Sequence, residues 1–401
     1  MTVQVASKTQ HTQEGSQARV DQYWMSQALD LARLAIGRVS PNPAVGAVIV
    51  RDDCLVGAGY TETPGQRHAE IVAIDEAGDL AAGATMYVTL EPCAHHGRTP
   101  PCLDSILRAG LARIVIAVRD PNPLVNGRSI TALRESGIDV EIGPGQDEAI
   151  QINAGFFRRL QTGKPEVHIK YAMSLDGKIA THTGHARWIT GSEARRQAHI
   201  IRDQSDAILV GIGTVLADDP LLTVRVTDSD AGAGGPCHPF RIVVDTHART
   251  PVASAMLDAE APGETLIAVS ELAPQERVEA LQRTGAETLT VPTRDGRIDL
   301  SALLDCLGAR GFNTLMVEGG AGIIGSLADE GLIDRVTAFV APVLLGGQGA
   351  PSPIAGAGVS EANDGLRLVY PTVNQIGRDV CVAGYLTGRY PDERLLVCSP
   401  G

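Results

Sequence analysis

Two successive runs of alternating strands and helices constrain the fold of this chain more than any other feature. In the first run, apolar and helical periodicities predict strands at 44–50, 55–60, 85–89 and 114–118, and helices at 21–37, 67–77, 101–109, 130–136 and 146–160. In the second run, strands at 167–172, 207–210, 241–245, 265–269, 314–317 and 336–340 alternate with helices at 193–203, 274–283, 301–309 and 322–330. Such alternation predicts two α/β domains, the second built on a mainly parallel sheet covered on both faces.

The break between the two runs lies at Thr162-Gly163-Lys164-Pro165, a helix-breaking stretch. A length of 401 residues suits two or three domains, and 44% hydrophobic residues are enough to give each a core. The polar start predicts a flexible tail over 1–19. We therefore expect a first domain over 20–163, a second over 164–390 and a C-terminal tail over 391–401.

The composition argues against several classes of partner. A net charge of −13 disfavours nonspecific binding to nucleic acid or to acidic membranes, because like charges repel. The seven cysteines are scattered and odd in number, which disfavours a disulfide scaffold. There is no apolar run of roughly 18 residues and no apolar core of a secretory signal near the start. These features predict a cytoplasmic protein without membrane or nucleic-acid partners.

A metal-binding pattern stands out in the first run. His68 and Glu70 open one predicted helix, Cys93 follows a strand, and Cys102 opens the next helix. One histidine and two thiolates form a three-ligand Zn²⁺ set that leaves the fourth position for water, whose pKa the ion lowers to around 7. Glu70, two residues after His68, could then shuttle protons. The order H-x-E, P-C and a second Cys is the zinc deaminase signature.

The spacing of the two cysteines departs from that signature. The usual pair is C-x-x-C, whereas eight residues separate Cys93 from Cys102 here, and His95, His96 and Arg98 in the loop become candidates to line a pocket. For His95 and His96, a pocket role, an extra ligand and a plain loop position remain open. A purely structural zinc in a non-catalytic scaffold is the alternative, but it usually takes four protein ligands and would leave Glu70 without a role.

In the second run, a glycine-rich turn follows an apolar strand. Glu318-Gly319-Gly320-Ala321-Gly322 leads from the strand at 314–317 into a helix, where the backbone could approach a phosphate. Such turns also exist only for close packing, and that alternative stays open on this motif alone. The turn is not the G-x-G-x-x-G of a Rossmann domain.

Taken together, these motifs resemble the bifunctional deaminase–reductases of riboflavin biosynthesis. The resemblance covers roughly 20–390, although Ala94 and Ala186 stand where relatives usually carry Ser. The matching stretches are Pro41-Asn42-Pro43-Ala44-Val45-Gly46, His68-Ala69-Glu70, the run from Glu91 to Cys102, Ser174-Leu175-Asp176-Gly177-Lys178, Arg187-Trp188-Ile189-Thr190, the run from Thr214 to Pro220, Leu222-Thr223-Val224-Arg225 and Glu318-Gly319-Gly320.

The resemblance implies a cytidine-deaminase-like first domain and a dihydrofolate-reductase-like second domain. The first would deaminate 2,5-diamino-6-(5-phosphoribosylamino)pyrimidin-4(3H)-one with Zn²⁺. The second would use NADPH to reduce the ribosyl arm, which gives 5-amino-6-(5-phosphoribitylamino)uracil. The protein would thus be a hydrolase and an oxidoreductase acting on a phosphorylated pyrimidine. A homo-oligomer is expected, although no pattern in the sequence reports the oligomeric state.

The resemblance also assigns residues. Glu70 would be catalytic, and His68, Cys93 and Cys102 would hold the metal. The implied cofactor positions are Ala172, Trp188, Thr214, Asp218, Thr246, Gly320, Ala321, Gly322, Ile323, Ile324, Gly325 and Ser326. The implied substrate positions are Asn42, Ala186, Arg202, Leu222, Arg225 and Glu318.

Physical chemistry leaves alternatives for some of these residues. Arg202 and Arg225 could hold phosphate through their guanidinium forks or sit in surface ion pairs. Trp188 could belong to a core, and Asp218 could cap a turn. Asp176 and Glu318 are candidates for proton transfer in the reduction.

One competing interpretation is a nucleoside or nucleic-acid deaminase joined to an unrelated C-terminal module. Deaminases that act on nucleic acid need a basic channel. The net charge of −13 and the 3% aromatic content disfavour that class of protein.

Overall fold

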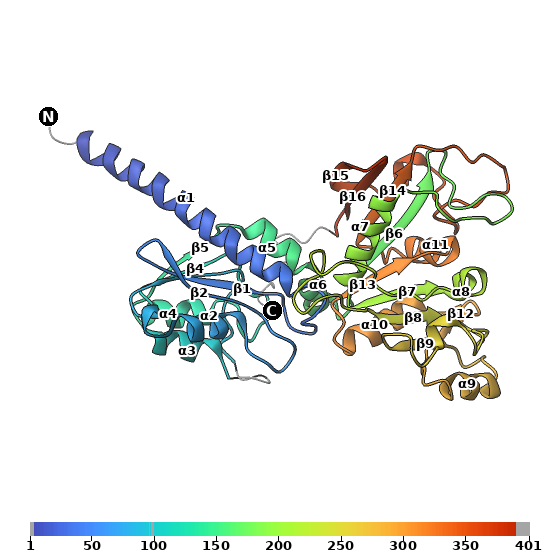
Figure 1. The fold of residues 1–401 in the computed structure, drawn as a ribbon, viewed down its shortest axis with the longest axis horizontal. Coiled ribbons are helices and arrows are strands. Elements are labelled where there is room, and N and C mark those ends of the chain that lie inside the picture. The colour runs from blue at the N-terminus through green and yellow to red at the C-terminus, as the bar shows by residue number, and fades with distance from the viewer. Residues whose placement is uncertain (1–3, 96, 98–99, 390–401) are drawn as a thin grey trace. The chain divides into compact units, whose positions relative to one another are not determined.

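The computed structural model of the chain describes residues 4–95, 97 and 100–389 (Figure 1). They form two compact units, one within Met1–Leu160 and the other within Gln161–Tyr390. The predicted C-terminal tail at 391–401 lies outside the described residues, and the predicted domain boundaries stay predictions. No helix in the described part of the chain combines the length and apolar character needed to span a bilayer.

A five-stranded sheet with the order β2-β1-β3-β4-β5 organises the first unit. Its strands are β1 (Gly46–Arg51), β2 (Cys54–Tyr60), β3 (Thr85–Val88), β4 (Arg113–Ile116) and β5 (Asp139–Ile142), of which β5 was not predicted. β1 pairs antiparallel with β2 and β3, whereas β3, β4 and β5 are parallel. The carboxyl ends of β3 and β4 therefore lie side by side at one edge of the sheet.

Helices cover both faces of this sheet (Figure 1). They are α1 (Gln4–Leu34), α2 (Ala69–Ala77), α3 (Cys102–Ala109), α4 (Arg128–Glu135), α5 (Gln146–Ile152) and α6 (Ala154–Thr162), with a short 3₁₀ turn at Gly78–Ala81. α1 begins far ahead of the predicted start at residue 21, so its backbone is helical through most of the segment predicted as a flexible tail.

The helix predicted at 146–160 is wrong as a single element, because Asn153 divides it into α5 and α6. The buried side chain of Asn153 accepts the Ala44 N–H at 2.8 Å and donates to the Ala44 carbonyl at 3.0 Å. Asn side chains that bond to backbone groups compete with helical hydrogen bonds. Asn153 thereby fixes the chain that leads into β1.

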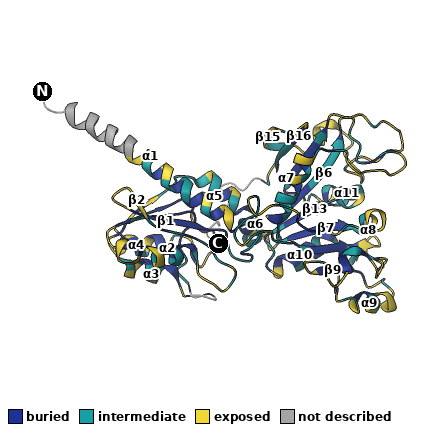
Figure 2. Ribbon diagram, viewed as in Figure 1, coloured by how far each residue is buried: buried dark blue, intermediate teal, exposed yellow. Residues whose placement is uncertain are grey.

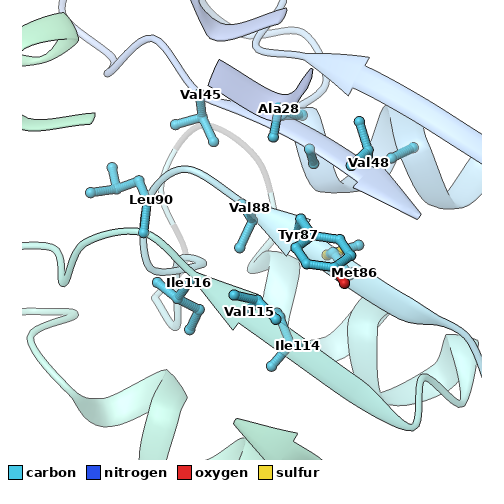
Figure 3. Packing of buried hydrophobic residues seen from close by; sticks show 14 of the residues in the cluster. Ala28, Val45, Val48, Met86, Tyr87, Val88, Leu90, Ile114, Val115 and Ile116 are labelled. Atoms are coloured by element: carbon cyan, nitrogen blue, oxygen red, sulfur yellow. The ribbon is translucent and has the colours of Figure 1, made fainter. Parts of the chain in front are cut away.

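The core of the first unit lies on β1, β3 and β4. Fully buried side chains from these strands, among them Val48, Met86 and Ile114, pack together (Figure 3). Figure 2 shows these central strands as buried. A run of apolar residues is typical of a strand with helices on both faces.

Glycines in β2 let α2 approach the sheet closely. A Cβ added at Gly59 would lie 2.5 Å from the Ala69 carbonyl oxygen, and one at Gly57 would lie 2.2 Å from the Ala73 oxygen. Any side chain at these positions would push α2 away. Because His68 caps α2 and Glu70 lies in its first turn, the two glycines help to position both residues.

A nine-stranded sheet with the order β10-β9-β8-β7-β13-β6-β14-β16-β15 organises the second unit. Its strands are β6 (Glu166–Ser174), β7 (Ala207–Gly211), β8 (Phe240–Val244), β9 (Thr265–Val269), β10 (Glu287–Thr290), β13 (Thr314–Glu318), β14 (Arg335–Ala341), β15 (Leu368–Ile376) and β16 (Asp379–Leu386). The strands from β10 to β14 are parallel, and β16 and β15 add antiparallel pairs. The predicted parallel sheet is confirmed.

Helices cover both faces of this second sheet. They are α7 (Ser192–Asp203), α8 (Ile212–Asp218), α9 (Gln275–Gln282), α10 (Leu300–Ala309) and α11 (Ala321–Asp329), with 3₁₀ turns at Ala255–Leu257 and Ala362–Asp364. Alternate residues of β7 separate the two layers: Leu209 joins a core with α10 and α11, whereas Ile208 joins a core with α9. A small hairpin of β11 (Thr293–Arg294) and β12 (Arg297–Ile298) precedes α10.

Candidate functional site

Three predicted metal ligands come together in the first unit. His68 is the N-cap of α2, Cys93 lies in the loop after β3, and Cys102 is the first residue of α3. Their ligand atoms lie within 4.8 Å of one another, with His68 Nδ1 at 3.6 Å from Cys93 Sγ and 3.3 Å from Cys102 Sγ. One imidazole and two sulfurs at this spacing fit a tetrahedral zinc ion with a position left for water.

A hydrogen bond between the two thiols shifts their pKa values in opposite directions. A hydrogen bond from Cys102 lowers the pKa of Cys93 to about 4, and the His68 imidazole acts in the same direction. The same hydrogen bond, together with burial, raises the pKa of Cys102. The pair therefore favours the thiolate form of Cys93, and binding of a cation would favour loss of the Cys102 proton as well.

Glu70 lies beside this cluster in the first turn of α2. Its side chain is buried, at 4% exposure. Burial raises the pKa of Glu70 to about 7, and the negative charge of Cys93 adds to the effect. A carboxyl group with a pKa near neutrality can both accept and return a proton, which is what general acid–base catalysis requires.

A cavity of about 220 Å³ opens onto the cluster. Asn42, the predicted substrate residue of this unit, lines it together with His68, Glu70 and Cys93. Sequence reasoning missed several other lining residues: Thr61, Leu90, Glu91, Asp120, Asn122 and Phe156. Asp120 and Asn122 follow β4, the parallel neighbour of β3. The signal that could have found them is a pair of polar residues just after a buried strand next to the one that precedes Cys93.

Glu91 and Asp120 shape the wall of the cavity. The buried Glu91 carboxylate accepts hydrogen bonds from the N–H groups of Asp120 and Gly127 and from the Ser129 hydroxyl, at 3.3, 2.9 and 2.7 Å. This tether holds the loop after β4 beside the metal cluster. Burial raises the pKa of Asp120 to about 7, and the charges of Glu91 and Cys93 add to it.

The loop between the two cysteines contributes His95. It lines the cavity, and its Nδ1 is buried without a hydrogen-bond partner in the described part of the chain. A buried nitrogen without a partner carries a free-energy cost, which a ligand in the cavity could remove. His96 and Arg98, the other predicted pocket candidates, lie outside the described residues.

The second unit carries a larger cavity, of about 910 Å³, around the glycine-rich turn after β13. Gly319 and Gly320 have φ of +84° and +80°, and a Cβ on either would lie 3.3 or 3.2 Å from the Thr214 hydroxyl. Because these glycines carry no side chains, the backbone of the turn stays accessible beside the Thr214 hydroxyl and the first residues of α11. Such a cradle fits the diphosphate of a dinucleotide.

The predicted cofactor residues fall into two groups. Thr214, Thr246, Gly320, Gly322, Ile323 and Ser326 line this cavity. Ala172, Asp218, Ala321, Ile324 and Gly325 are not among its lining residues. Ile324 is buried in the core, and Gly325 gives room to the Ala355 carbonyl oxygen, which would lie 2.2 Å from an added Cβ. Within α11, helical geometry explains the split, because only one side of the helix can face the cavity, whereas Ala172 lies in β6 and Asp218 ends α8.

Trp188 lies elsewhere and is not a core residue. Its side chain is 69% exposed, with φ of +67°, and the Arg195 guanidinium lies 4.3 Å from its ring centroid. It lines a separate cavity of about 300 Å³ with Arg187, Val343, Leu345 and Arg378. A bulky residue with positive φ is strained, and such strain concentrates at functional sites.

Arg202 and Glu318 form a buried ion pair. Arg202 donates from Nε and an Nη atom to the two Glu318 oxygens at 2.9 and 2.5 Å, and from its other Nη to the Thr223 carbonyl at 3.0 Å. Burial opposes the charge of Glu318, but Arg202 and Lys170 outweigh it and bring its pKa to about 2. Arg202 is therefore not a surface ion pair, and Glu318 is held as a carboxylate; their substrate-binding roles stay predictions.

The other predicted substrate residues differ in exposure. Arg225 and Ala186 are exposed, whereas the Leu222 side chain is buried in a core cluster with φ of +54°. The Arg225 N–H donates to His199 Nδ1 at 3.3 Å. Burial and the nearby Arg202 and Arg225 lower the pKa of His199 to about 4, so that its imidazole is neutral at pH 7.

Asp176 acts as a tether. Its carboxylate accepts the N–H groups of Leu345 and Gly346 at 3.0 and 2.7 Å and the Ser174 hydroxyl at 2.6 Å. The Ser174 hydrogen bond and these backbone bonds lower the pKa of Asp176 to about 2. The carboxylate is thus held in its ionised form, and its proton-transfer role stays a prediction.

Comparison with known proteins matches both units. The family described as the cytidine and deoxycytidylate deaminase zinc-binding region matches residues 18–118, and the RibD C-terminal domain family matches residues 165–382. The chain is 41% identical over 369 residues to the riboflavin biosynthesis protein RibD of Escherichia coli, which covers 90% of this chain and 98% of that protein. The RibD of Aquifex aeolicus is 39% identical over 363 residues, with the same coverage.

Comparison with solved structures identifies the same family. A RibD structure from Acinetobacter baumannii aligns with a TM-score of 0.81 and 37% identity, and covers 92% of this chain and 99% of that one. The deaminase/reductase of Thermotoga maritima, described as acting on diaminohydroxyphosphoribosylaminopyrimidine and 5-amino-6-(5-phosphoribosylamino)uracil, aligns with a TM-score of 0.79 and 31% identity at the same coverage. With a zinc-binding deaminase unit, a reductase unit and relatives matched over nearly their whole length, the chain belongs to the RibD family of bifunctional riboflavin-biosynthesis deaminase–reductases.

Proposed function

We propose that the first unit hydrolyses the 2-amino group of 2,5-diamino-6-(5-phosphoribosylamino)pyrimidin-4(3H)-one. The second unit then reduces the ribosyl arm with NADPH, which gives 5-amino-6-(5-phosphoribitylamino)uracil. The substrates named for the Thermotoga maritima relative support this assignment. We further assign deamination to residues 20–163 and reduction to residues 164–390.

The single observation that carries the deaminase proposal is the placement of Glu70 beside the three-ligand cluster. A zinc ion held by His68, Cys93 and Cys102 would lower the pKa of a water molecule to near 7. Glu70 takes a proton from the attacking water and passes it to the departing amine nitrogen, so that water and the amine become a ring carbonyl and ammonia. Its buried carboxyl group, with a pKa of about 7, suits both directions of transfer.

The lining of the cavity supports a pyrimidine as the substrate. Asn42, Asp120 and Asn122 offer hydrogen-bonding groups for the edge of a ring, and Phe156 offers an apolar face. Polar groups that converge on a pocket set the orientation of a small ligand. In this proposal Asn42 contacts the substrate.

For the reductase step, NADPH supplies hydride and the protein supplies position. We assign the cofactor to the cavity at the Gly319-Gly320 turn and the substrate to the side of Arg202, Arg225 and Glu318. The Arg202 and Glu318 side chains would keep their orientation during the reaction, because both are ionised and largely buried. Trp188, whose ring lies against the Arg195 guanidinium, would contact the cofactor from the smaller cavity that it lines.

A coupled assay on the full-length protein tests both activities. Ammonia release and NADPH oxidation are measured separately, with and without a zinc chelator. We expect the chelator to stop ammonia release and to spare NADPH oxidation when the deaminated substrate is supplied. Ammonia release that survives complete zinc removal would contradict the deaminase proposal, and failure to oxidise NADPH would contradict the reductase proposal.

We also propose that the protein is a homo-oligomer. β15 is an edge strand of the large sheet and exposes Tyr370 at 77% and Val373 at 65%. An exposed apolar edge strand can pair with a strand of another chain. Light scattering over a range of concentrations checks this, and a monomer throughout would contradict it.

The cysteines support an assignment to the cytoplasm. The six cysteines in the described part of the chain are free thiols. Two of them are proposed metal ligands, which must stay reduced to bind zinc. Fractionation of cells that express a tagged protein tests the location, and recovery outside the cytoplasm would contradict it.

A further inference from the structure

One loop of the first unit contributes three consecutive residues, Pro41, Asn42 and Pro43, to the wall of the cavity beside the metal cluster. The loop leads from the end of α1 into β1 and lies outside any helix or strand. Of the three side chains, that of Asn42 alone carries hydrogen-bonding groups. The conformation of the loop therefore decides where the one polar side chain of this stretch points.

The peptide unit that joins Pro41 to Asn42 is held at both of its polar groups. The Asn42 N–H donates to the Val39 carbonyl at 2.8 Å. The Pro41 carbonyl accepts a hydrogen bond from an Nη atom of Arg159 at 2.7 Å. Because a peptide unit is planar, two bonds on its opposite edges fix the orientation of the plane from which Asn42 departs.

A second anchor holds the loop two residues after Asn42. Asn153 bonds to both backbone groups of Ala44, at 2.8 and 3.0 Å, and the ring of Pro43 restricts the φ angle between the two anchors. Asn153 is 2% exposed, whereas Arg159 is half-buried. The anchor at Pro41 can therefore be removed with less damage to the core than the anchor at Ala44.

α6 brings Arg159 to this loop. Phe156, one turn earlier on the same helix, lines the cavity, and residues three positions apart are neighbours on a helix surface. Arg159 itself does not line the cavity. The helix thus faces the site with an aromatic ring and, one turn later, supports the loop that carries Asn42.

We propose that Arg159 is a positioning residue of the deaminase site, which directs Asn42 towards the substrate by holding the Pro41 carbonyl. This inference rests on the proposed function, in which Asn42 contacts the pyrimidine. Arg159 touches no reacting atom, so it acts through Asn42 and not on the proton transfers of Glu70. Loss of such a contact weakens the ground state and the transition state alike, which raises KM and leaves kcat unchanged.

The competing role for Arg159 is support of the fold without influence on substrate binding. Arg134 supplies the matched control, because each arginine lies in the last turn of its helix and donates to a backbone carbonyl. Arg134 on α4 donates to the Val140 carbonyl at 3.0 Å, and neither of these two residues lines the cavity. A purely structural role predicts that R159M and R134M have the same effect on catalysis.

A double-mutant cycle on the full-length, zinc-loaded protein tests the proposal. Ammonia release from 2,5-diamino-6-(5-phosphoribosylamino)pyrimidin-4(3H)-one gives kcat and KM for the parent, R159M, N42A, R159M/N42A and R134M. Methionine keeps the apolar stem of arginine and removes its donors. Atomic absorption measures the zinc content of each variant, and thermal unfolding shows that each is folded.

We expect N42A to raise KM by about 10-fold, the effect of one lost hydrogen bond. R159M should raise KM by about 3- to 10-fold and keep kcat within about 2-fold of the parent value. In the N42A background R159M should have no further effect on KM, because the residue through which it acts is already gone. R134M should keep both kinetic constants, and all variants should keep their zinc.

Additive effects of R159M and N42A on KM would overturn the inference, because Arg159 would then act without Asn42. Loss of zinc, or a fall in kcat as large as the rise in KM, would assign Arg159 to the metal cluster or the fold. A rise in KM that R134M reproduces, or an unchanged KM in N42A, would also contradict the proposal. Absence of ammonia release from the parent protein would instead contradict the proposed deaminase function itself.

Discussion

Glu70 and Glu318 are both largely buried glutamates in the two candidate sites, yet their pKa values move in opposite directions. The His68 imidazole lowers the pKa of Glu70, but burial and the neighbouring sulfur anion of Cys93 outweigh it and raise that pKa to about 7. Glu318 is clamped by Arg202, and its pKa falls to about 2. The difference shows that a fixed positive partner, rather than the degree of burial, decides whether a buried carboxyl group exchanges protons or stays ionised.

The largest effect is expected when Glu70 is replaced. In E70Q the amide cannot carry protons, so ammonia release should fall by about 10³- to 10⁴-fold, which is the upper range for a lost general acid–base group. Zinc content, measured by atomic absorption, and NADPH oxidation should stay at the parent level.

E76Q is the matched control, because Glu76 lies on the same helix, α2, and is exposed. It should keep both activities. Loss of bound zinc in E70Q would mean that Glu70 holds the metal site together rather than moving protons.

Breaking the ion pair of Arg202 and Glu318 should lower the stability of the fold. R202M leaves Glu318 buried without its partner, which should cost about 3 to 5 kcal/mol of unfolding free energy. R196M on the same helix breaks a pair with Asp230 in which the arginine is 62% exposed, and it should cost no more than about 1 kcal/mol. Denaturant unfolding of the two variants measures both, and equal losses would contradict the comparison.

The same pair predicts how stability depends on pH. The folded-state pKa of Glu318, about 2, lies below its unfolded value of about 4.3. Its stabilising contribution is therefore complete above pH 4.3 and disappears as the pH falls towards 2. This acid-dependent part should be absent from the double variant R202M/E318Q, and its persistence there would assign it to other carboxylates.

The sequence predicted the two sites unequally. The metal cluster was predictable because His68, Glu70, Cys93 and Cys102 sit at the starts of helices and the end of a strand, where backbone geometry leaves few choices. Asp120 was missed because its role depends on β4 lying beside β3, which a linear pattern does not show. The Arg202–Glu318 pair joins residues 116 positions apart, so no local spacing could distinguish it from a phosphate fork.

The sequence analysis also missed strand β15, for a physical reason. β15 contains Pro371 and mostly exposed side chains, and it is a strand because it pairs with β16 at the edge of the sheet. Edge strands tolerate proline and lack the buried apolar pattern of central strands. The parallel strands β6, β7 and β13, which are buried on both faces, were all predicted.

A medium effect is expected at the glycine that sets the position of Glu70. In G59A the new Cβ would lie 2.5 Å from the Ala69 carbonyl oxygen, so α2 must shift, at a cost of about 1 to 3 kcal/mol. Gly349 has no positive φ and no atom within 4 Å of an added Cβ, which makes G349A the neutral control. Thermal unfolding measures both variants. If G59A lowers stability but leaves ammonia release intact, the environment of Glu70 does not depend on this close approach.

The smallest effect is expected at Asp176, an exposed carboxylate that is nonetheless a strong acid. Like Glu318 it holds a charge, but its partners are the Leu345 and Gly346 N–H groups and the Ser174 hydroxyl rather than an arginine. D176N replaces one carboxylate oxygen by a donor, so at least one of these bonds must be lost, and the loop that carries Val343 and Leu345 beside Trp188 should loosen. Hydrogen exchange at the amides of residues 345 and 346 should become faster, and the fluorescence of Trp188 should shift, with little change in global stability.

D258N is the matched control, because Asp258 accepts the Glu260 N–H at 2.9 Å in a turn that lines neither the cavity at the glycine-rich turn nor the one beside Trp188. Unchanged exchange at both amides in D176N would show that the loop is held without the carboxylate.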